Sequence, residues 1–430
     1  MLKPRIIIFH SLVIMFFISM IGCATHSKLA QRVNRDIQIE DQKTKKIYMP
    51  FELINNLVVI PLRINNSDTL RFVLDTGVGR TLITELSANK EFTIRYSGKV
   101  TLSGLGEAEP MEALFSAGNS VYLEGIKGDS LDIVLMLEDR FNLSSFMGRE
   151  VNGLIGYDIF KNFIVEIDYL NKRLYFHDPD LYRQGYQKKK KSRFWTEIPI
   201  EINARKPYIN STVVQHDSSV IETKLLIDSG ASHAISIYPA SSPEISIPPK
   251  NLYSYLGSGL SGEIYGEIGR VKSMNFGELT LKEPVVHYPE EVGTRRALQL
   301  GNRNGSVGAD LLKRFTVFIN YEDGSMLVKP NKQSYRDFNY NMAGIELSTP
   351  FLGIPFYLVS QVREGSPAEK AGLRVNDIIM EVDYKHTFRY SLVELYDIFQ
   401  SRDKRKISIV VNRDDEVKEF IFRLRDDTRN

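Results

Sequence analysis

The sequence predicts a mainly β protein made of two related lobes, followed by a smaller α+β domain. Three observations predict this fold class. First, Phe72–Gly77 (FVLDTG) reappears 153 residues later as Leu225–Gly230 (LLIDSG). Second, Asn152–Asp158 (NGLIGYD) reappears as Asn304–Asp310 (NGSVGAD), at an offset one residue shorter. Blocks that are repeated in the same order, at nearly the same distance along the chain, indicate two copies of one unit. Third, the chain after residue 340 has its own pattern of short strands and two helices.

The N-terminal segment predicts export. Lys3 and Arg5 precede an apolar run, Ile6–Gly22, which ends at the sole cysteine, Cys23. The sequence MIGC at 20–23 resembles a bacterial lipobox, in which the cysteine is acylated and becomes the first residue of the mature lipoprotein. We therefore expect a signal peptide at 1–22 and a bacterial envelope protein, facing the periplasm or exposed at the cell surface. The alternatives are an uncleaved membrane anchor and a chance cysteine. The polar residues 23–47 are expected to form a flexible tether.

The repeat divides the next part of the chain into lobe 1 at 48–187 and lobe 2 at 195–330. Runs of β-branched and apolar residues predict strands, and glycine clusters predict hairpin tips. The clearest of these are the strands 57–64, 69–74, 163–169 and 315–321 and the tips 104–106 and 257–262. The basic residues 188–191 lie in a segment, 188–194, that we expect to be a linker. A role in binding nucleic acid or lipid headgroups is the alternative.

A short helix is expected to follow Gly156 in lobe 1 and Gly308 in lobe 2. Asp158 and Asp310 stand at the positions where a carboxylate can cap the first turn of such a helix. We therefore interpret this second pair of aspartates as helix caps. Asp168 aligns with Asn320, so the repeat does not predict another pair of carboxylates.

The duplicated Asp-Thr/Ser-Gly turns point to acid–base chemistry. Two aspartates held close together cannot both ionise, so they share one proton. One then acts as a general base towards water, and the other as a general acid towards an amide carbonyl. The hydroxyls of Thr76 and Ser229 can hydrogen-bond across a pseudo-twofold axis. Gly77 and Gly230 permit tight turns and a close approach of substrate.

Both copies resemble the retropepsin-type aspartic peptidases, whose unit has an apolar strand, Asp-Thr/Ser-Gly, a glycine-bearing flap and apolar-apolar-Gly before a short helix. The resemblance implies β-barrel lobes related by a pseudo-twofold axis, with both lobes in one chain as in pepsin-like enzymes. It implies that Asp75 and Asp228 are the catalytic dyad. It implies supporting roles in the catalytic loops for Thr76, Gly77, Ser229 and Gly230. It implies flap hairpins that contact substrate at Ser103, Gly104, Ser258 and Gly259.

The C-terminal segment 341–428 is similar to bacterial PDZ domains. The similarity rests on Gly365–Leu373 (GSPAEKAGL) and on the following Asp377-Ile378-Ile379. Ser366 can cap a helix that Gly372 ends, a second helix is expected at 391–400, and strands at 407–412 and 417–424 form a hairpin. The resemblance implies capture of a protein C-terminus by strand addition. It implies that the carboxylate is bound by the loop Ala343, Gly344 and Ile345. The alternative is a module that only packs on the peptidase lobes.

Composition excludes several classes of function. Lys and Arg number 55 and Asp and Glu 53, so no nucleic-acid partner is expected. With 43% hydrophobic and 25% charged residues, the chain is not intrinsically disordered. One cysteine excludes an intramolecular disulfide and a CxxC metal site. Seven histidines without an HExxH motif argue against a zinc peptidase. Neither a metal nor a cofactor is expected.

These features predict an exported, lipid-anchored aspartic endopeptidase that hydrolyses peptide bonds in peptide or protein substrates. The competing hypothesis is a catalytically inert scaffold that binds peptides in the peptidase cleft and the PDZ groove. Two complete Asp-Thr/Ser-Gly motifs favour the enzyme.

Overall fold

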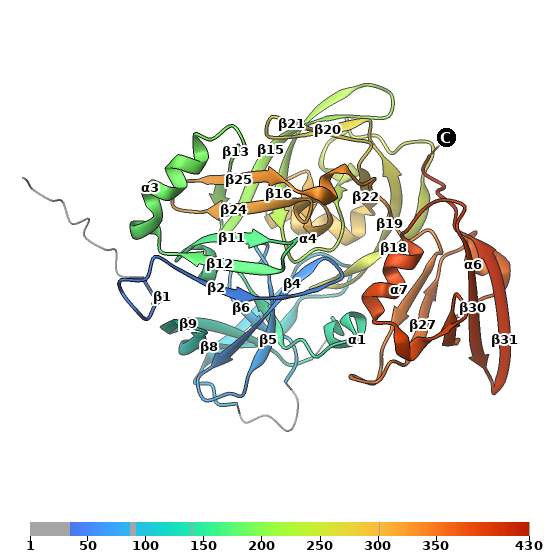
Figure 1. The fold of residues 1–430 in the computed structure, drawn as a ribbon, viewed down its shortest axis with the longest axis horizontal. Coiled ribbons are helices and arrows are strands. Elements are labelled where there is room, and N and C mark those ends of the chain that lie inside the picture. The colour runs from blue at the N-terminus through green and yellow to red at the C-terminus, as the bar shows by residue number, and fades with distance from the viewer. Residues whose placement is uncertain (1–34, 87–91, 139–140, 301, 430) are drawn as a thin grey trace, which may run out of the picture. The chain divides into compact units, whose positions relative to one another are not determined.

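The computed structural model describes residues 35–86, 92–138, 141–300 and 302–429. The predicted signal peptide and Cys23 lie outside the described residues. Residues from Arg35 onward cluster into one unit, which contains both lobes and the C-terminal domain (Figure 1). Among the helices that the structure describes, none is long and apolar enough to cross a membrane.

Lobe 1 is built on a nine-stranded sheet with the order β1-β9-β6-β10-β5-β4-β8-β7, and β3 pairs with β4. Its strands are β1 (Ile37–Ile39), β3 (Glu52–Ile54), β4 (Leu57–Ile64), β5 (Leu70–Leu74), β6 (Thr81–Ile83), β7 (Tyr96–Leu102), β8 (Met111–Leu123), β9 (Ile126–Met136) and β10 (Gly153–Ile155). The predicted strands 57–64 and 69–74 correspond to β4 and β5.

Lobe 2 repeats this plan in a ten-stranded sheet with the order β18-β19-β22-β17-β23-β16-β15-β20-β21, and β14 pairs with β15. Its strands are β14 (Glu201–Asn203), β15 (Lys206–Val214), β16 (Val220–Asp228), β17 (Ile235–Ile237), β18 (Leu252–Gly259), β19 (Gly262–Arg270), β20 (Ser273–Phe276), β21 (Leu279–Lys282), β22 (Val285–Pro289) and β23 (Gly305–Gly308).

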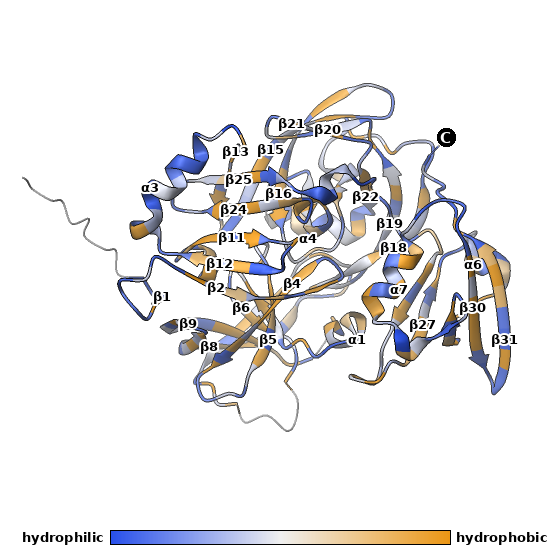
Figure 2. Cartoon of the chain, viewed as in Figure 1, coloured by the Kyte–Doolittle hydropathy of each residue, from blue (hydrophilic) through white to orange (hydrophobic). Residues whose placement is uncertain are grey.

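A third sheet joins the two lobes. Its order is β13-β25-β24-β11-β12-β2, and the antiparallel pair β11–β24 brings equivalent strands of the two copies together. Its strands are β2 (Lys46–Pro50), β11 (Ile164–Asp168), β12 (Arg173–His177), β13 (Thr196–Pro199), β24 (Phe315–Asn320) and β25 (Ser325–Pro330). Hydrophobic residues fill these central strands (Figure 2).

Short helices and turns complete the described part of the lobes. They are α1 (Leu143–Met147), α2 (Tyr157–Phe160), α3 (Pro179–Lys190), η1 (Pro239–Ser241), α4 (Glu291–Leu300), α5 (Ala309–Leu312) and η2 (Lys332–Tyr335). By position in the chain, α1 and α4 are counterparts, as are α2 and α5.

The C-terminal domain is a separate sheet with the order β26-β27-β28-β30-β31, and β29 pairs with β28. Its elements are β26 (Ile345–Ser348), β27 (Tyr357–Val362), α6 (Pro367–Ala371), β28 (Ile378–Val382), β29 (Lys385–His386), η3 (Thr387–Arg389), α7 (Leu392–Phe399), β30 (Lys406–Arg413) and β31 (Glu416–Arg423). Ser366 caps α6 and Gly372 ends it at a φ of 104°. The predicted fold class, mainly β with two related lobes and an α+β C-terminal domain, is confirmed.

Several segments differ from the sequence-based expectation. Residues 35–47, expected to belong to a flexible tether, contain β1 and the start of β2. Ile37 and Ile39 bury their side chains because β1 pairs with β9. Lys188–Lys190 do not lie in a linker but in the last turn of α3, where Lys190 pairs with Glu197 and Asp323.

The predicted caps are also corrected. Helices α2 and α5 begin after Gly156 and Gly308, without a side-chain cap. The Asp158 carboxylate instead accepts hydrogen bonds from Thr81, and Asp310 pairs with Lys313 and Arg314. The Asp158 carboxylate therefore serves a tertiary contact, whereas the Asp310 carboxylate serves ion pairs with residues three and four positions along the chain.

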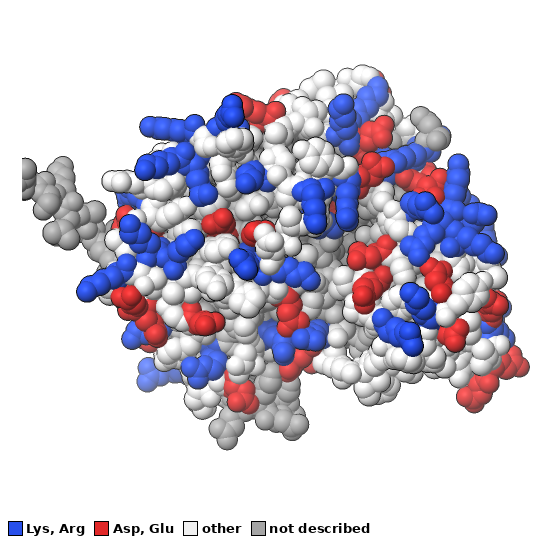
Figure 3. All heavy atoms as spheres, viewed as in Figure 1, with Lys and Arg blue, Asp and Glu red and all other residues white. Residues whose placement is uncertain are grey.

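The C-terminal domain packs on lobe 2 through its last residues. The Arg270 guanidinium donates to Thr428 and Asp426, and it also donates to the carbonyl of Phe338. Phe338 and Tyr340 are buried, so the connection between lobe 2 and the C-terminal domain is packed at its end. Basic and acidic side chains are interspersed on the face drawn in Figure 3.

Candidate active site

The two Asp-Thr/Ser-Gly loops meet where the lobes join. Asp75 directly follows β5 and Asp228 ends β16. Each of these strands has a parallel partner, β10 for β5 and β23 for β16. The partner strands lead into Gly156 and Gly308, where a Cβ atom would collide with backbone oxygens in and just after the Asp-Thr/Ser-Gly loops. This close backbone contact explains the glycine of each repeated apolar-apolar-Gly segment.

Reciprocal hydrogen bonds tie the two loops together. The Thr76 hydroxyl donates to the Ile227 carbonyl at 2.6 Å and accepts from the Ser229 N–H at 3.0 Å. The Ser229 hydroxyl donates to the Leu74 carbonyl at 2.8 Å and accepts from the Thr76 N–H at 3.0 Å. The arrangement is twofold symmetric and buried, so it fixes the distance between the two loops.

The carboxyl groups of Asp75 and Asp228 hydrogen-bond to each other. The N–H of Gly77 donates to Asp75 Oδ1 at 2.6 Å. A Cβ on Gly77 would lie 2.9 Å from Asp228 Oδ1, and one on Gly230 would overlap the Asp75 carboxyl. Both glycines are therefore needed for the two carboxyls to approach.

The two aspartates are electrostatically unequal. Burial, followed by the negative charge of Asp228, raises the pKa of Asp75 to about 8. Burial also raises the pKa of Asp228, but the positive charges of Arg303 and Lys206 oppose this rise. The directions of these effects favour the shared proton on Asp75 and the negative charge on Asp228.

Lys206 and Arg303 were not singled out from the sequence. Lys206 begins β15, and Arg303 directly precedes the repeated Asn304. Their counterparts in lobe 1 are Leu57 and Val151, which belong to a buried apolar cluster. An alignment of the two copies beyond the repeated blocks would have shown that lobe 2 has a cation at two positions where lobe 1 has an apolar residue.

A neutral histidine pair lies behind the second loop. The His233 and His287 rings are 5.6 Å apart, and His233 Nε2 hydrogen-bonds to Ser306 Oγ. Burial lowers the pKa of His233 to about 3 and that of His287 to about 4. The pair therefore carries no charge at neutral pH and leaves the cationic role near Asp228 to Lys206 and Arg303.

The predicted flaps are hairpins whose tips touch. The tip between β7 and β8 contains Ser103 and Gly104, and Gly104 N–H donates to Ser261 Oγ at 3.2 Å. The second tip joins β18 to β19 just beyond Ser258 and Gly259.

Further contacts fasten the two tips. The N–H of Ser261 donates to the Leu105 carbonyl at 2.8 Å, and the N–H of Ala108 donates to the Ser261 carbonyl at 2.6 Å. The side chain of Arg296, on α4, donates to the Ala108 carbonyl and to Ser261. The two tips are thus held together.

The predicted carboxylate loop is packed into the C-terminal domain. Ala343 and Ile345 are buried. The N–H of Gly344 donates to Asn341 Oδ1 at 3.1 Å, and the N–H of Met342 donates to the Phe399 carbonyl at 3.1 Å. These two N–H groups are engaged inside the domain rather than directed at a ligand.

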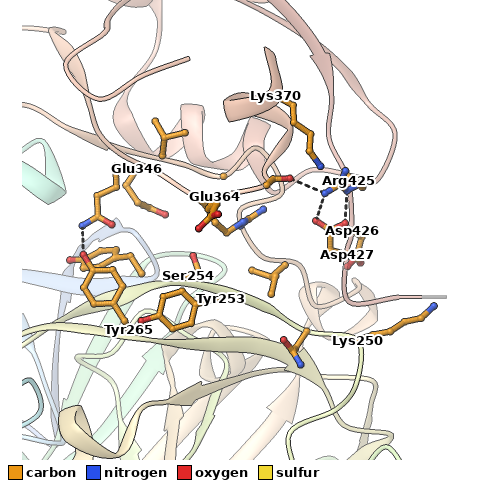
Figure 4. A pocket seen from close by; sticks show the side chains of 18 of the residues that line it. Lys250, Tyr253, Ser254, Tyr265, Glu346, Glu364, Lys370, Arg425, Asp426 and Asp427 are labelled. Atoms are coloured by element: carbon orange, nitrogen blue, oxygen red, sulfur yellow. Dashed lines mark hydrogen bonds and ion pairs between the residues drawn. The ribbon is translucent and has the colours of Figure 1, made fainter. Parts of the chain in front are cut away.

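A groove of about 910 Å³ lies away from the dyad, between β18 and the C-terminal domain (Figure 4). Tyr253 and Ser254 line it from lobe 2, while Glu346, Glu364 and Lys370 line it from the other side. Its walls carry both signs of charge and contain neither aspartate of the dyad. Among the residues that the structure describes, no cluster of three or more histidines, cysteines or acidic residues is placed to bind a metal.

Comparisons with known proteins gave one family match and similarities to solved structures. A family model of the PDZ domain matches residues 358–413, so the C-terminal domain contains a PDZ domain. Among solved structures, the chain is similar to an aspartic proteinase from Irpex lacteus, at 12% sequence identity and a TM-score of 0.41. That similarity covers 67% of this chain and 98% of the other. The comparison with curated proteins gave no match.

Proposed function

We propose that this chain is a retropepsin-type aspartic endopeptidase that uses Asp75 and Asp228 to activate water. The observation that carries the proposal is the meeting of two buried aspartates on symmetric loops, with their carboxyls hydrogen-bonded to each other. Thr76 and Ser229 hold the loops in register. Such a dyad suits the hydrolysis of an unactivated amide without a cofactor.

The unequal carboxyls suggest their roles. The Asp228 carboxylate accepts a proton from water, and the water oxygen bonds to the carbonyl carbon of the substrate. Asp75 donates its proton to the carbonyl oxygen, which gives a neutral tetrahedral diol. Proton transfer from Asp228 to the amide nitrogen then lets the C–N bond break, while a diol hydroxyl returns its proton to Asp75. The products are one carboxyl and one amine terminus, and the dyad regains its starting protonation.

The proposal includes two features outside the catalytic loops. Lys3, Arg5, the apolar run and Cys23 support export and lipid anchoring in a bacterial envelope. The PDZ domain implies peptide binding. Ser103, Gly104, Ser258 and Gly259 are proposed to contact substrate, because they lie in or beside the flap tips.

The test is cleavage of a diverse peptide mixture by residues 24–430 as wild type, Asp75→Asn and Asp228→Asn. The matched control is Asp168→Asn. Asp168 accepts its hydrogen bonds from Asn171 in an exposed turn, and its counterpart in lobe 2 is already an asparagine, Asn320. Circular dichroism and thermal melting establish that each variant is folded.

We expect the wild type and the control to cleave peptides. We expect the rate of cleavage to fall at least about 1,000-fold in both dyad variants. Wild-type rates in a folded Asp75→Asn protein would exclude the dyad. Peptide binding without cleavage by every form would favour the inert scaffold instead.

A further inference from the structure

The sheet of the PDZ domain ends in β26 on one side and β31 on the other, and the β26 edge faces α7. Within the described chain, β26 pairs with β27 and has no strand on its other side. A peptide that adds a strand to a PDZ-like sheet bonds to the backbone of such an edge and lies between it and the neighbouring helix. We call the space between β26 and α7 the PDZ groove; it is distinct from the groove of Figure 4. A peptide can bind in the PDZ groove only if the backbone groups along the β26 edge are unpaired.

Those backbone groups are already bonded. The N–H of Leu347 donates to the hydroxyl of Tyr396, on α7, at 3.0 Å. The N–H of Thr349 donates to the carbonyl of Ser145 at 3.0 Å, and the Thr349 hydroxyl donates to the same carbonyl at 2.8 Å. The first contact closes the groove from within the PDZ domain, whereas the second comes from lobe 1.

The lobe 1 partner is α1, which lies beside α7 and β26 (Figure 1). Val393 on α7 packs against the apolar cluster that contains Met147, and Leu143 packs against the same cluster. Gly148, which ends α1, approaches so closely that a Cβ placed on it would lie 3.4 Å from the Cβ of Leu392. Polar and apolar contacts thus hold the same short segment against the groove.

This segment is also connected to the candidate dyad. It leads through Val151 and Asn152 into β10, whose last residue, Ile155, accepts a hydrogen bond from the N–H of Asp75 at 2.8 Å. The apolar cluster that receives Val393 also includes Leu57 and Val73, which flank the first catalytic loop. A short series of packed residues therefore connects the groove to the loop that contains Asp75.

We propose that residues 143–147 of lobe 1 are the resident occupant of the PDZ groove, so that an extended peptide binds β26 only after displacing them. A peptide ligand and the lobe 1 segment compete for one edge. The apparent affinity for the peptide is then the intrinsic affinity multiplied by the fraction of molecules whose groove is open. The proposal concerns binding and holds whether or not the dyad cleaves peptides.

The first test needs no ligand. In residues 24–430, hydrogen exchange is followed at the amides of Leu347 and Thr349. We expect both amides to be protected, because both donate to partners within the chain. Exchange of the Thr349 amide at the rate of an unstructured peptide would overturn the proposal.

The second test locks and opens the groove. Gly148→Cys with Leu392→Cys places two Cβ atoms at about the separation that a disulfide requires. Residues 24–430 contain no other cysteine, since Cys23 is the only one in the chain. The opened variant carries Leu143→Ser and Val393→Ser, which weaken the apolar contact. Val417→Ser is the matched control, because Val417 is 72% exposed on β31.

Peptides with free C-termini are selected from a displayed library on the opened variant, and their affinities are measured for all forms. We expect the wild type and the control to bind these peptides about tenfold more weakly than the opened variant does. This difference corresponds to a groove that is open one-tenth of the time in the wild type. We expect no binding by the oxidised cysteine pair and recovery on reduction. Equal affinity of the locked, wild-type and opened forms would overturn the proposal, as would failure of the folded opened variant to select any peptide.

Discussion

Lys206 lies opposite Asp228 across the β15–β16 strand pair, at the position that Leu57 occupies opposite Asp75 in lobe 1. The registers Tyr208–Leu226 and Val59–Val73, each continued by two residues, give these two pairs. Residues directly opposite each other in an antiparallel pair place their side chains on the same face. Asp228 therefore has a lysine opposite it where Asp75 has a leucine, although the loops themselves are symmetric. The charge of Lys206 acts on both carboxyls, and that of Arg303 acts on Asp228.

This asymmetry predicts the pH dependence of peptide cleavage. In the proposed mechanism, activity requires ionised Asp228 and protonated Asp75, so the rate is expected to rise with pH through the pKa of Asp228. It falls again as the pH passes through about 8, the pKa of Asp75. We expect a bell-shaped plot of kcat/KM against pH whose alkaline limb lies near pH 8. An alkaline limb at the ordinary pKa of an aspartate would contradict this assignment of the proton.

Replacing the lysine tests the origin of the asymmetry. Lys206 lowers the pKa of both Asp75 and Asp228, so Lys206→Leu should move both limbs towards higher pH. We expect a displacement of about one pH unit in the acid limb. Lys224→Leu is the control, because Lys224 lies on β16 but pairs with Glu201. The same displacement in the control would rule out a specific effect of Lys206.

Gly230→Ala should abolish cleavage by misplacing a carboxyl. The added Cβ would overlap the Asp75 carboxyl, which must then move away from Asp228. A displacement of about 1 Å lowers the rate about 100-fold, and we expect at least this loss in kcat. Gly293→Ala is the matched control, because the nearest atom to its Cβ would be 3.7 Å away. Full activity of Gly230→Ala would show that the approach of the two loops is looser than the structure indicates.

Thr76→Val tests the bonds that join the loops. Valine has nearly the shape of threonine but would leave the Ile227 carbonyl and the Ser229 N–H without the partners they now have. Burying unpaired polar groups costs about 1–3 kcal/mol each, so we expect a lower free energy of unfolding by at least about 2 kcal/mol. Urea denaturation measures it. Thr101→Val on the exposed strand β7 should change stability by less than about 0.5 kcal/mol.

The repeated blocks were sufficient to predict the parts of the site that depend on symmetry. Asp75, Asp228 and the hydroxyls of Thr76 and Ser229 lie where the duplication places them, because both copies of the loop have the same local sequence. The helix ends Ser366 and Gly372 were also predictable, since capping depends on residues only a few positions apart. Their roles in catalysis and peptide binding stay predictions.

Contacts between distant segments were not predictable in the same way. Ile37 and Ile39 form a strand of only three residues, which becomes stable because β9 supplies its partner. The Asp158 carboxylate reaches Thr81, although its sequence position also suits a helix cap. Likewise, nothing local to Thr349 indicates that its N–H is bonded to Ser145. In each case tertiary pairing decides between two locally acceptable structures.

The flap contacts predict how the cleft opens. Arg296, on α4, donates to the Ala108 carbonyl of one tip and to Ser261 of the other, and it pairs with Glu109. Arg296→Gln removes this charged bridge, so the tips should separate more often, while the dyad remains intact. We expect KM to rise about threefold to tenfold with little change in kcat, because a loss of about 1 kcal/mol in closing the flaps is a loss of substrate binding. Arg295→Gln is the control, since Arg295 is the exposed neighbour on the same helix. A fall in kcat at constant KM would instead show that Arg296 acts on the dyad. If Arg296→Gln and Arg295→Gln had the same kcat and KM, the remaining backbone bonds between the tips would suffice to close the cleft.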